Sequence, residues 1–135
     1  MTPEKLISMA MAAMDNAYAP YSGFKVGAAL LCSDGTVYTG CNIENAAYGP
    51  TNCAERTAIF KAVSEGHRDF TAIAVCGGKD GRIIGTFPPC GVCRQVMREF
   101  CRDDFIVYLA DSGSAYKTMT LADLLPFSFG KTSLN

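Results

Sequence analysis

The hydrophobic and polar positions of this chain fall into blocks whose periods predict helices alternating with strands. Apolar residues recur at helical spacing after Thr2 and Pro3, which suit the N-cap and first position of a helix, and this helix must end before Ala19-Pro20. Apolar runs bounded by turn-forming residues predict strands. The other predicted helices are residues 52–65, 90–102 and 121–125, and the predicted strands are residues 25–32, 36–42, 70–76, 105–110 and 116–119.

The order of these elements predicts an α/β fold. Alternation of strands and helices in the middle of the chain favours parallel pairing, with helices on both faces of the sheet. Ser33-Asp34-Gly35 reads as a hairpin turn between the first two strands, and the link between the last two is too short for a parallel crossover. We therefore expect a three-layer α/β/α sandwich with a mixed five-stranded sheet, in which residues 77–89 form a glycine-rich loop.

Composition and charge then limit the classes of function. The 135 residues fit a single domain, 1–135, and 49% hydrophobic with 19% charged residues exclude a disordered chain. A net charge of -1 argues against nucleic acid or an anionic membrane as a partner. Arg94, Arg98 and Arg102 are interleaved with acidic residues, which favours a solvated helix face. With no apolar run of about 18 residues and no export signal, we expect a soluble, cytoplasmic protein.

The chain has seven cysteines, and this odd number without an export signal fits poorly with a disulfide framework. Cys32 and Cys76 end apolar runs, so we assign them to the core, where free cysteine packs as a small hydrophobe. Cys41 and Cys101 also suit packing better than chemistry. The other three cysteines have positions that suggest a different role.

These three lie at the starts of two predicted helices. Cys53 begins one helix, and Cys90 and Cys93 share the first turn of the next, where free N–H groups and the helix dipole favour thiolate over thiol. Zinc binds deprotonated sulfur. Because His67 reads as a surface residue in a polar turn, three protein ligands would leave one position open, which is typical of catalytic zinc. Glu55 would then lie beside that open position.

The specificity of this pattern depends on its length. A lone Cys-x-x-Cys is equally compatible with a redox pair or simple packing. The full pattern, Cys53-Ala54-Glu55 followed by Pro89-Cys90-Gly91-Val92-Cys93, matches the three-cysteine form of the zinc nucleobase deaminase signature.

On these stretches the chain resembles the small homotetrameric cytidine deaminases that act on free nucleosides. The resemblance extends from the first helix to Pro126 and is most specific at residues 20–30, 40–46, 53–58 and 89–95. It implies hydrolytic deamination of cytidine and 2′-deoxycytidine to uridine and 2′-deoxyuridine with release of ammonia, a step of pyrimidine salvage. It also implies one Zn²⁺ per chain, held by Cys53, Cys90 and Cys93.

The resemblance further implies roles for individual residues. Glu55 would shuttle protons between a zinc-activated hydroxide and the cytosine ring. Arg56 would donate hydrogen bonds to the sulfurs, because three thiolates and Zn²⁺ sum to a charge of about -1 and weaken the Lewis acid. The implied substrate contacts are Phe24 at the pyrimidine, Asn42 and Glu44 at the ribose hydroxyls, Ala54, and Phe129 from a neighbouring subunit of the homotetramer, with Phe127 as a second candidate for that last position.

Other functions share parts of the pattern. A deaminase of a cytosine nucleoside antibiotic is the nearest alternative, although Asn42, Glu44 and the C-terminal phenylalanines favour the ribonucleoside. A polynucleotide deaminase would need a basic channel, which a slightly acidic chain does not suggest. A non-enzymatic zinc or redox protein would have no need of Glu55.

Overall fold

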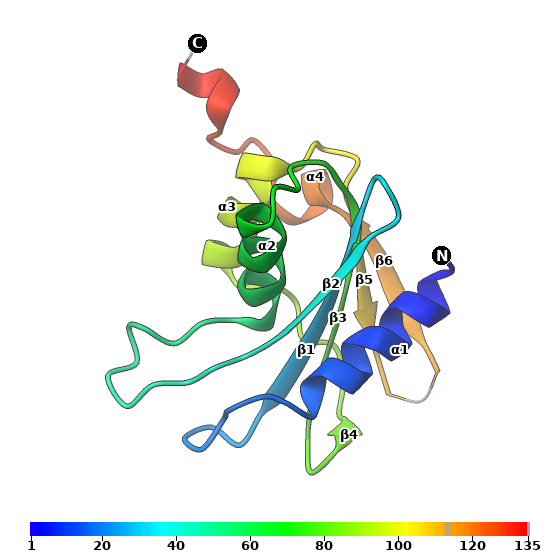
Figure 1. The fold of residues 1–135 in the computed structure, drawn as a ribbon, viewed down its shortest axis with the longest axis vertical. Helices are drawn as coiled ribbons and strands as arrows, with labels where there is room; N and C mark the ends of the chain where they lie inside the picture. Colours follow the sequence, from blue (N-terminus) through cyan, green and yellow to red (C-terminus); the bar gives the residue numbers. More distant parts are fainter. Residues whose placement is uncertain (113, 135) are drawn as a thin grey trace.

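The computed structural model describes residues 1–112 and 114–134 and has three layers, helix, sheet and helix (Figure 1). The sheet has the order β2-β1-β3-β5-β6, and the short β4 pairs with β3. The strands are β1 (Lys25–Cys32), β2 (Val37–Cys41), β3 (Phe70–Lys79), β4 (Arg82–Ile83), β5 (Ile106–Ala110) and β6 (Tyr116–Thr120). The helices are α1 (Pro3–Met14), α2 (Ala54–Ser64), α3 (Gly91–Phe100), α4 (Leu121–Leu124) and the 3₁₀ helix η1 (Lys131–Leu134).

The connections between strands explain why the sheet is mixed. β3 and β5 are joined through α3 and pair in parallel, with Ala72 opposite Ile106. The other pairs are antiparallel. The turn after β1 closes as a hairpin, since Gly35 has a φ of 92° and donates its N–H to the Cys32 carbonyl at 3.0 Å. The predicted sandwich and the five strands of the main sheet are confirmed.

The prediction of a loop over residues 77–89 was wrong in its first part. β3 continues to Lys79 and turns back through Asp80 and Gly81 into β4. Both turn residues have positive φ, 54° and 74°, as the type I′ hairpin turn requires. Gly78 lies inside the strand, and this position requires glycine because a side chain there would collide with the Arg82 backbone. The glycines that suggested a loop therefore permit close backbone packing instead.

The helices are shorter than predicted at their ends. α1 is capped by Thr2 as expected, through a 3.1 Å bond from the Lys5 N–H, but it ends at Met14, well before Pro20. α2 starts after Cys53 because Asn52 is held by Ile43 in an isolated bridge. Among the described helices, none combines the length and apolarity needed to cross a membrane.

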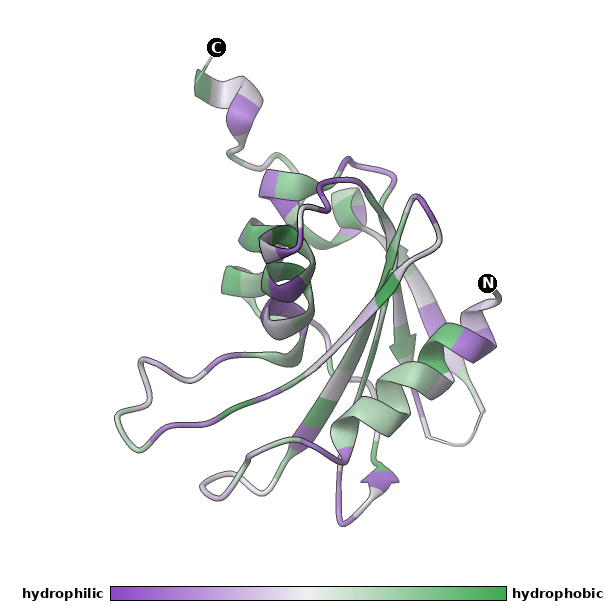
Figure 2. Cartoon of the chain, in the orientation of Figure 1, coloured by the Kyte–Doolittle hydropathy of each residue, from purple (hydrophilic) through white to green (hydrophobic). Residues whose placement is uncertain are grey.

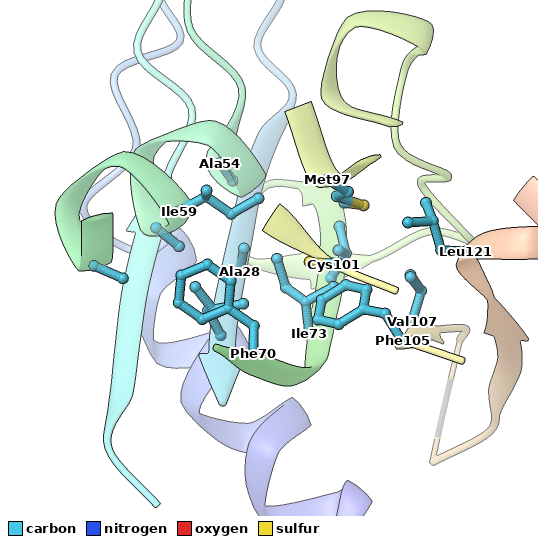
Figure 3. Packing of buried hydrophobic residues seen from close by; sticks show 14 of the residues in the cluster. Ala28, Ala54, Ile59, Phe70, Ile73, Met97, Cys101, Phe105, Val107 and Leu121 are labelled. Atoms are coloured by element: carbon cyan, nitrogen blue, oxygen red, sulfur yellow. The ribbon is translucent and has the colours of Figure 1, made fainter. Parts of the chain in front are cut away.

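The core lies on both faces of the sheet. α1 covers one face, where Leu6 and Ala10 pack on small side chains such as Ala74. α2, α3 and α4 cover the other face, which holds the larger cluster shown in Figure 3. Hydropathy follows these layers in Figure 2, with green segments on the strands and on the helix faces that meet them.

The four cysteines assigned to packing lie outside the chemical cluster described below. Cys32 and Cys76 are 2% and 0% exposed, which confirms them as core residues. Cys101 is also buried, and Cys41 is half-buried.

Candidate active site

Two helix N-termini meet at the edge of the core and bring three thiols together. Cys53 is the N-cap of α2, Cys90 is the N-cap of α3, and Cys93 lies in the first turn of α3. The sulfurs of Cys53 and Cys90 are 3.8 Å apart, and those of Cys90 and Cys93 are 3.5 Å apart. All three lie within 4.8 Å of one another.

This spacing fits a tetrahedral zinc ion. A Zn–S bond of about 2.3 Å in tetrahedral geometry places two sulfurs about 3.8 Å apart. Within the described residues, no fourth histidine, cysteine or carboxylate joins the group. His67, which was predicted not to be a ligand of this site, lies elsewhere beside Cys32 and Asp34. The arrangement therefore provides three protein ligands and one open position.

The electrostatics of the site favour a thiolate at Cys53. Hydrogen bonds from Cys93 and then Arg56 lower the pKa of Cys53 to about 5, against the opposing effect of burial, while the same hydrogen bond and burial raise the pKa of Cys93. The Nη2 of Arg56 lies 3.3 Å from the Cys53 sulfur. Burial acts against the charge of Arg56, but hydrogen bonds to Cys53 and Cys93 hold its pKa above the usual value. Arg56 therefore offsets part of the negative charge that three thiolates would carry.

Glu55 is the one buried acidic side chain among the described residues, with 4% of its surface exposed. It lies in the first turn of α2, two residues after Cys53, and both residues line the same pocket. Burial, together with the charge of the neighbouring Cys53, raises the pKa of Glu55 to about 7. The backbone N–H of Glu55 and the charge of Arg56 act in the opposite direction. A carboxylate in this state can both accept and release a proton near neutral pH.

The pocket in front of Glu55 has a volume of about 200 Å³. Sequence reasoning missed part of its wall. Phe87 packs over Gly77, where an added Cβ would lie 2.5 Å from the ring, and its ring centroid is 6.0 Å from that of Phe24. The lining residues are Val26, Asn42, Thr51, Asn52, Cys53, Ala54, Glu55, Phe87, Pro88 and Cys90.

The predicted substrate contacts divide between this pocket and a neighbouring hollow. Asn42 and Ala54 line the pocket, whereas Phe24 does not line it and lies next to it through the pairing of its ring with that of Phe87. Glu44 lines a second hollow of about 360 Å³, and Thr51 borders both. The two hollows therefore adjoin at Thr51, and together they are called the groove below, with Cys53 and Cys90 in the first of them.

Asn42 and Glu44 also hold the loops that shape this groove. The Asn42 amide accepts the Val26 N–H at 2.8 Å and donates to the Phe24 carbonyl at 2.8 Å. Glu44 accepts the backbone N–H groups of Tyr21 and Ser22 at 2.9 and 3.1 Å. The Ser22 hydroxyl, followed by these N–H groups, lowers the pKa of Glu44, so the carboxylate is ionised.

The C-terminal segment lies apart from the pocket of its own chain. Phe127 and Phe129 are 110% and 62% exposed, and neither lines the pocket near Glu55. The segment is tied to α3 by the side chain of Gln95, which donates to the Phe129 carbonyl at 2.9 Å, and by the pair of Lys131 with Glu99 at 3.7 Å. In Figure 1 this tail and η1 project away from the sheet.

The helix face read as solvated is only partly so. Arg98 pairs with Asp103 at 2.7 Å, and Arg102 with Asp104 at 3.5 Å. Arg94 instead donates to the carbonyls of Pro89 and Leu124, both at 2.7 Å, and so fixes the segment that leads into Cys90. The prediction was wrong for Arg94, whose partners are backbone carbonyls outside α3, and for Arg98, whose side chain is only 15% exposed.

Gly40 of β2 sets the position of α2. A Cβ on Gly40 would lie 2.5 Å from the Ala58 nitrogen and 2.6 Å from the Ala54 oxygen. We expect Gly40→Ala to displace the first turns of α2, lower the free energy of unfolding by about 1–3 kcal/mol and lower turnover by up to about 10²-fold. Gly49→Ala is the control, since the nearest atom to its Cβ would be 3.7 Å away.

Thermal unfolding and kinetic assays of both variants check this expectation. If Gly40→Ala kept wild-type activity and melting temperature, close packing of α2 on β2 would not position the site.

Comparison with known proteins agrees with this geometry. Over residues 1–109 the chain matches the cytidine and deoxycytidylate deaminase zinc-binding region. A cytidine deaminase of Sporosarcina psychrophila is 53% identical over 135 residues, covering 100% of this chain and 96% of that protein. One from Halalkalibacterium halodurans is 51% identical over 135 residues, covering 100% and 99%. The crystal structure of cytidine deaminase from Burkholderia pseudomallei has a TM-score of 0.88 at 50% identity, covering 96% of this chain and 100% of that one.

Proposed function

Because the chain belongs to the family of zinc-dependent cytidine deaminases, we propose that Glu55 is the proton shuttle in its hydrolytic deamination of cytidine and 2′-deoxycytidine. The observation that carries this proposal is the burial of Glu55 in the pocket that also exposes Cys53 and Cys90. A carboxylate without a catalytic task would rarely be buried there, since burial disfavours its charge.

Zinc held by the three thiolates supplies a Lewis acid that lowers the pKa of water to about 7. Glu55 takes a proton from the attacking water and delivers it to N3 of cytosine, which makes C4 electrophilic. The water oxygen bonds to C4, and Glu55 then passes the second proton to the amino group. The C4–N bond breaks, ammonia leaves and uridine remains. General acid–base help of this kind contributes about 10²–10⁴-fold.

The groove supports a nucleoside laid along it. The base would enter the pocket beside Ala54, with Phe24 and Phe87 as an aromatic wall. The ribose would then lie toward the adjoining hollow, where the Glu44 carboxylate can accept hydrogen bonds from its hydroxyls. Asn42, between the two, has one amide hydrogen left for the sugar after its bond to Phe24.

We also propose a homotetramer with shared active sites. The pocket of about 200 Å³ in this chain is smaller than the roughly 300–1,000 Å³ of ordinary ligand sites, and walls from a neighbouring subunit would extend the enclosed space. Phe129 is 62% exposed on the projecting tail, where it gains nothing from its own core. Inserted into a neighbouring subunit, this side chain would exclude water from that subunit's site.

Phe129→Ala is therefore expected to raise KM more than it changes the melting temperature. A mixture of Phe129→Ala and Glu55→Gln chains should regain activity, because mixed assemblies bring an intact Glu55 and an intact Phe129 to one site. Phe127→Ala tests the second candidate of the same tail, and it should leave KM unchanged if Phe129 is the side chain that closes the site. Activity of co-refolded chains is compared with that of each variant alone. No recovery in verified mixed assemblies would leave Phe129 as a local residue.

The substrate class is tested by following ultraviolet absorbance with cytidine, 2′-deoxycytidine, a cytosine nucleoside antibiotic and single-stranded DNA. We expect turnover of the two nucleosides and none of the DNA. Faster turnover of the antibiotic than of the two nucleosides would instead support the alternative, a deaminase of a cytosine nucleoside antibiotic. We further propose that residues 1–135 act as one domain in the cytoplasm, since none of the seven cysteines forms a disulfide bond.

A further inference from the structure

A second group of metal-ligating side chains lies at the other end of α2 from the zinc triad. One sulfur of Cys32, one carboxylate oxygen of Asp34 and one ring nitrogen of His67 lie within 4.8 Å of one another. They come from the end of β1, the hairpin turn and the segment between α2 and β3. Since an α-helix rises about 1.5 Å per residue, the length of α2 separates this group from Cys53 by more than about 15 Å.

Hydrogen bonding assigns the protons of His67. The Tyr38 hydroxyl lies 2.8 Å from Oε2 of Glu65 and 3.1 Å from Nδ1 of His67. An ionised carboxylate only accepts, so Tyr38 donates to Glu65 and its oxygen is left to accept from Nδ1–H of His67. The bond to Glu65 raises the pKa of Tyr38 to about 12, which keeps the hydroxyl proton in place. In this tautomer the neutral ring has its lone pair on Nε2.

That lone pair faces a second acceptor. Nε2 of His67 lies 3.2 Å from Oδ2 of Asp34. The other oxygen of Asp34 accepts the Thr36 N–H at 3.0 Å, so the carboxylate is already oriented by its own turn. Two acceptors this close need a positive charge between them or on the ring, either a proton on Nε2 or a metal ion.

The surroundings favour a cation that binds sulfur. Cys32 is 2% exposed. Burial, followed by the charges of Asp34 and Asp69, raises the pKa of its thiol to about 11, so the thiol keeps its proton unless a metal ion binds the sulfur. Asp34 and Asp69 supply negative charge on the side of the thiol. The nearby cation, Arg68, donates to the carbonyls of Val63 and His67 at 2.6 and 3.1 Å, and so neutralises neither carboxylate by a direct bond.

We propose that Cys32, Asp34 and His67 form a second Zn²⁺ site, with His67 binding through Nε2 while Tyr38 holds Nδ1–H. Sulfur, imidazole nitrogen and carboxylate oxygen are together the ligands of zinc, whereas calcium and magnesium take oxygen alone. Donation of the other ring N–H to a fixed acceptor is the usual support of a zinc-bound histidine. With three ligands and Asp34 59% exposed, the site is weaker than the triad and fills only when zinc is added.

Zinc here would join the β1–β2 hairpin to the segment that follows α2. A ligand that binds only the folded chain stabilises it in proportion to the logarithm of its concentration. The zinc-loaded enzyme should therefore melt at a higher temperature when further zinc is added, with no change in cytidine turnover.

His67 is the only histidine of the chain, so its ring resonances identify themselves in an NMR spectrum. Zinc-loaded protein is titrated with Zn²⁺ at fixed pH. We expect the His67 signals to shift and saturate at one added equivalent, and Asp34→Asn to weaken this binding at least about tenfold. Asp69→Asn is the matched control, because it removes a charge near Cys32 without removing a ligand. It should weaken binding less than Asp34→Asn.

Two results would overturn the second site. A His67 ring that titrates with a raised pKa but ignores added Zn²⁺ would show a proton bridge to Asp34 instead. Equal weakening by Asp34→Asn and Asp69→Asn would show diffuse charge attraction only. Cys32→Ala extends the test to the sulfur: the protein must still turn over cytidine, which proves folding, while its His67 signals respond to zinc less tightly.

Discussion

Glu55→Gln is expected to lower cytidine turnover by at least about 10²–10⁴-fold while the protein keeps its zinc and its fold. Glutamine has nearly the same shape but cannot take a proton from water or pass one to the leaving amino group. Because Glu55 is 4% exposed and burial opposes its charge, the neutral amide should leave the melting temperature unchanged or higher. Rate, zinc content and thermal unfolding are measured on the same preparation.

Glu4→Gln is the control for this substitution, since it makes the same chemical change on an exposed side chain of α1. It should leave the rate unchanged. Substantial residual activity in Glu55→Gln with full zinc content would falsify the proton-shuttle assignment.

Cys93→Ala is expected to remove the zinc and nearly all activity together. Cys93 is 0% exposed at the meeting point of α2 and α3, so its loss leaves two sulfurs for an ion that takes four ligands. Metal analysis and the uridine assay check both losses.

Cys76→Ala separates this effect from the loss of any buried thiol. Cys76 is also 0% exposed but lies on the α1 face of the sheet. Its replacement should keep the zinc and cost roughly 1 kcal/mol of stability through a small cavity. Full zinc retention by Cys93→Ala would show that the ligand set is wrong.

The metal centre could be predicted from sequence because its ligands lie at helix starts, which are local features. The caps and first turns that hold Cys53 and Cys90 depend on nearby residues, and the signature around them is specific. That Glu55 lies in the same pocket as Cys53 followed from its place two residues along the same turn. The contact from Arg56 to the Cys53 sulfur was also expected and is present at 3.3 Å.

Features that depend on distant segments could not be predicted in this way. Phe87 faces the pocket because Gly77 gives it room, and nothing near Phe87 in the sequence indicates that contact. His67 reads as a surface residue of a polar turn, but folding places its ring 5.1 Å from that of Tyr38. The Asp80-Gly81 turn did carry a local hairpin signal, which the glycines before it obscured.

The predicted substrate contacts are a third case, because the same side chains that border the groove also hold neighbouring backbone in place. Asn42 and Glu44 were expected at the ribose, and both border the groove. Their side chains also hold the backbone of β1 and of the loop before it. Substituting either residue would therefore change both the shape of the groove and its contacts with the sugar, so these residues separate the two effects poorly.

The most direct test follows deamination as zinc is removed and restored. Protein is treated with a chelator in steps, and at each step the zinc per chain and the rate of uridine formation from cytidine are measured together. The account predicts that the rate falls in proportion to the zinc that Cys53, Cys90 and Cys93 hold and returns when that zinc is restored. Uridine formation that continues at full rate in metal-free protein, or its absence in fully loaded protein, would contradict the account.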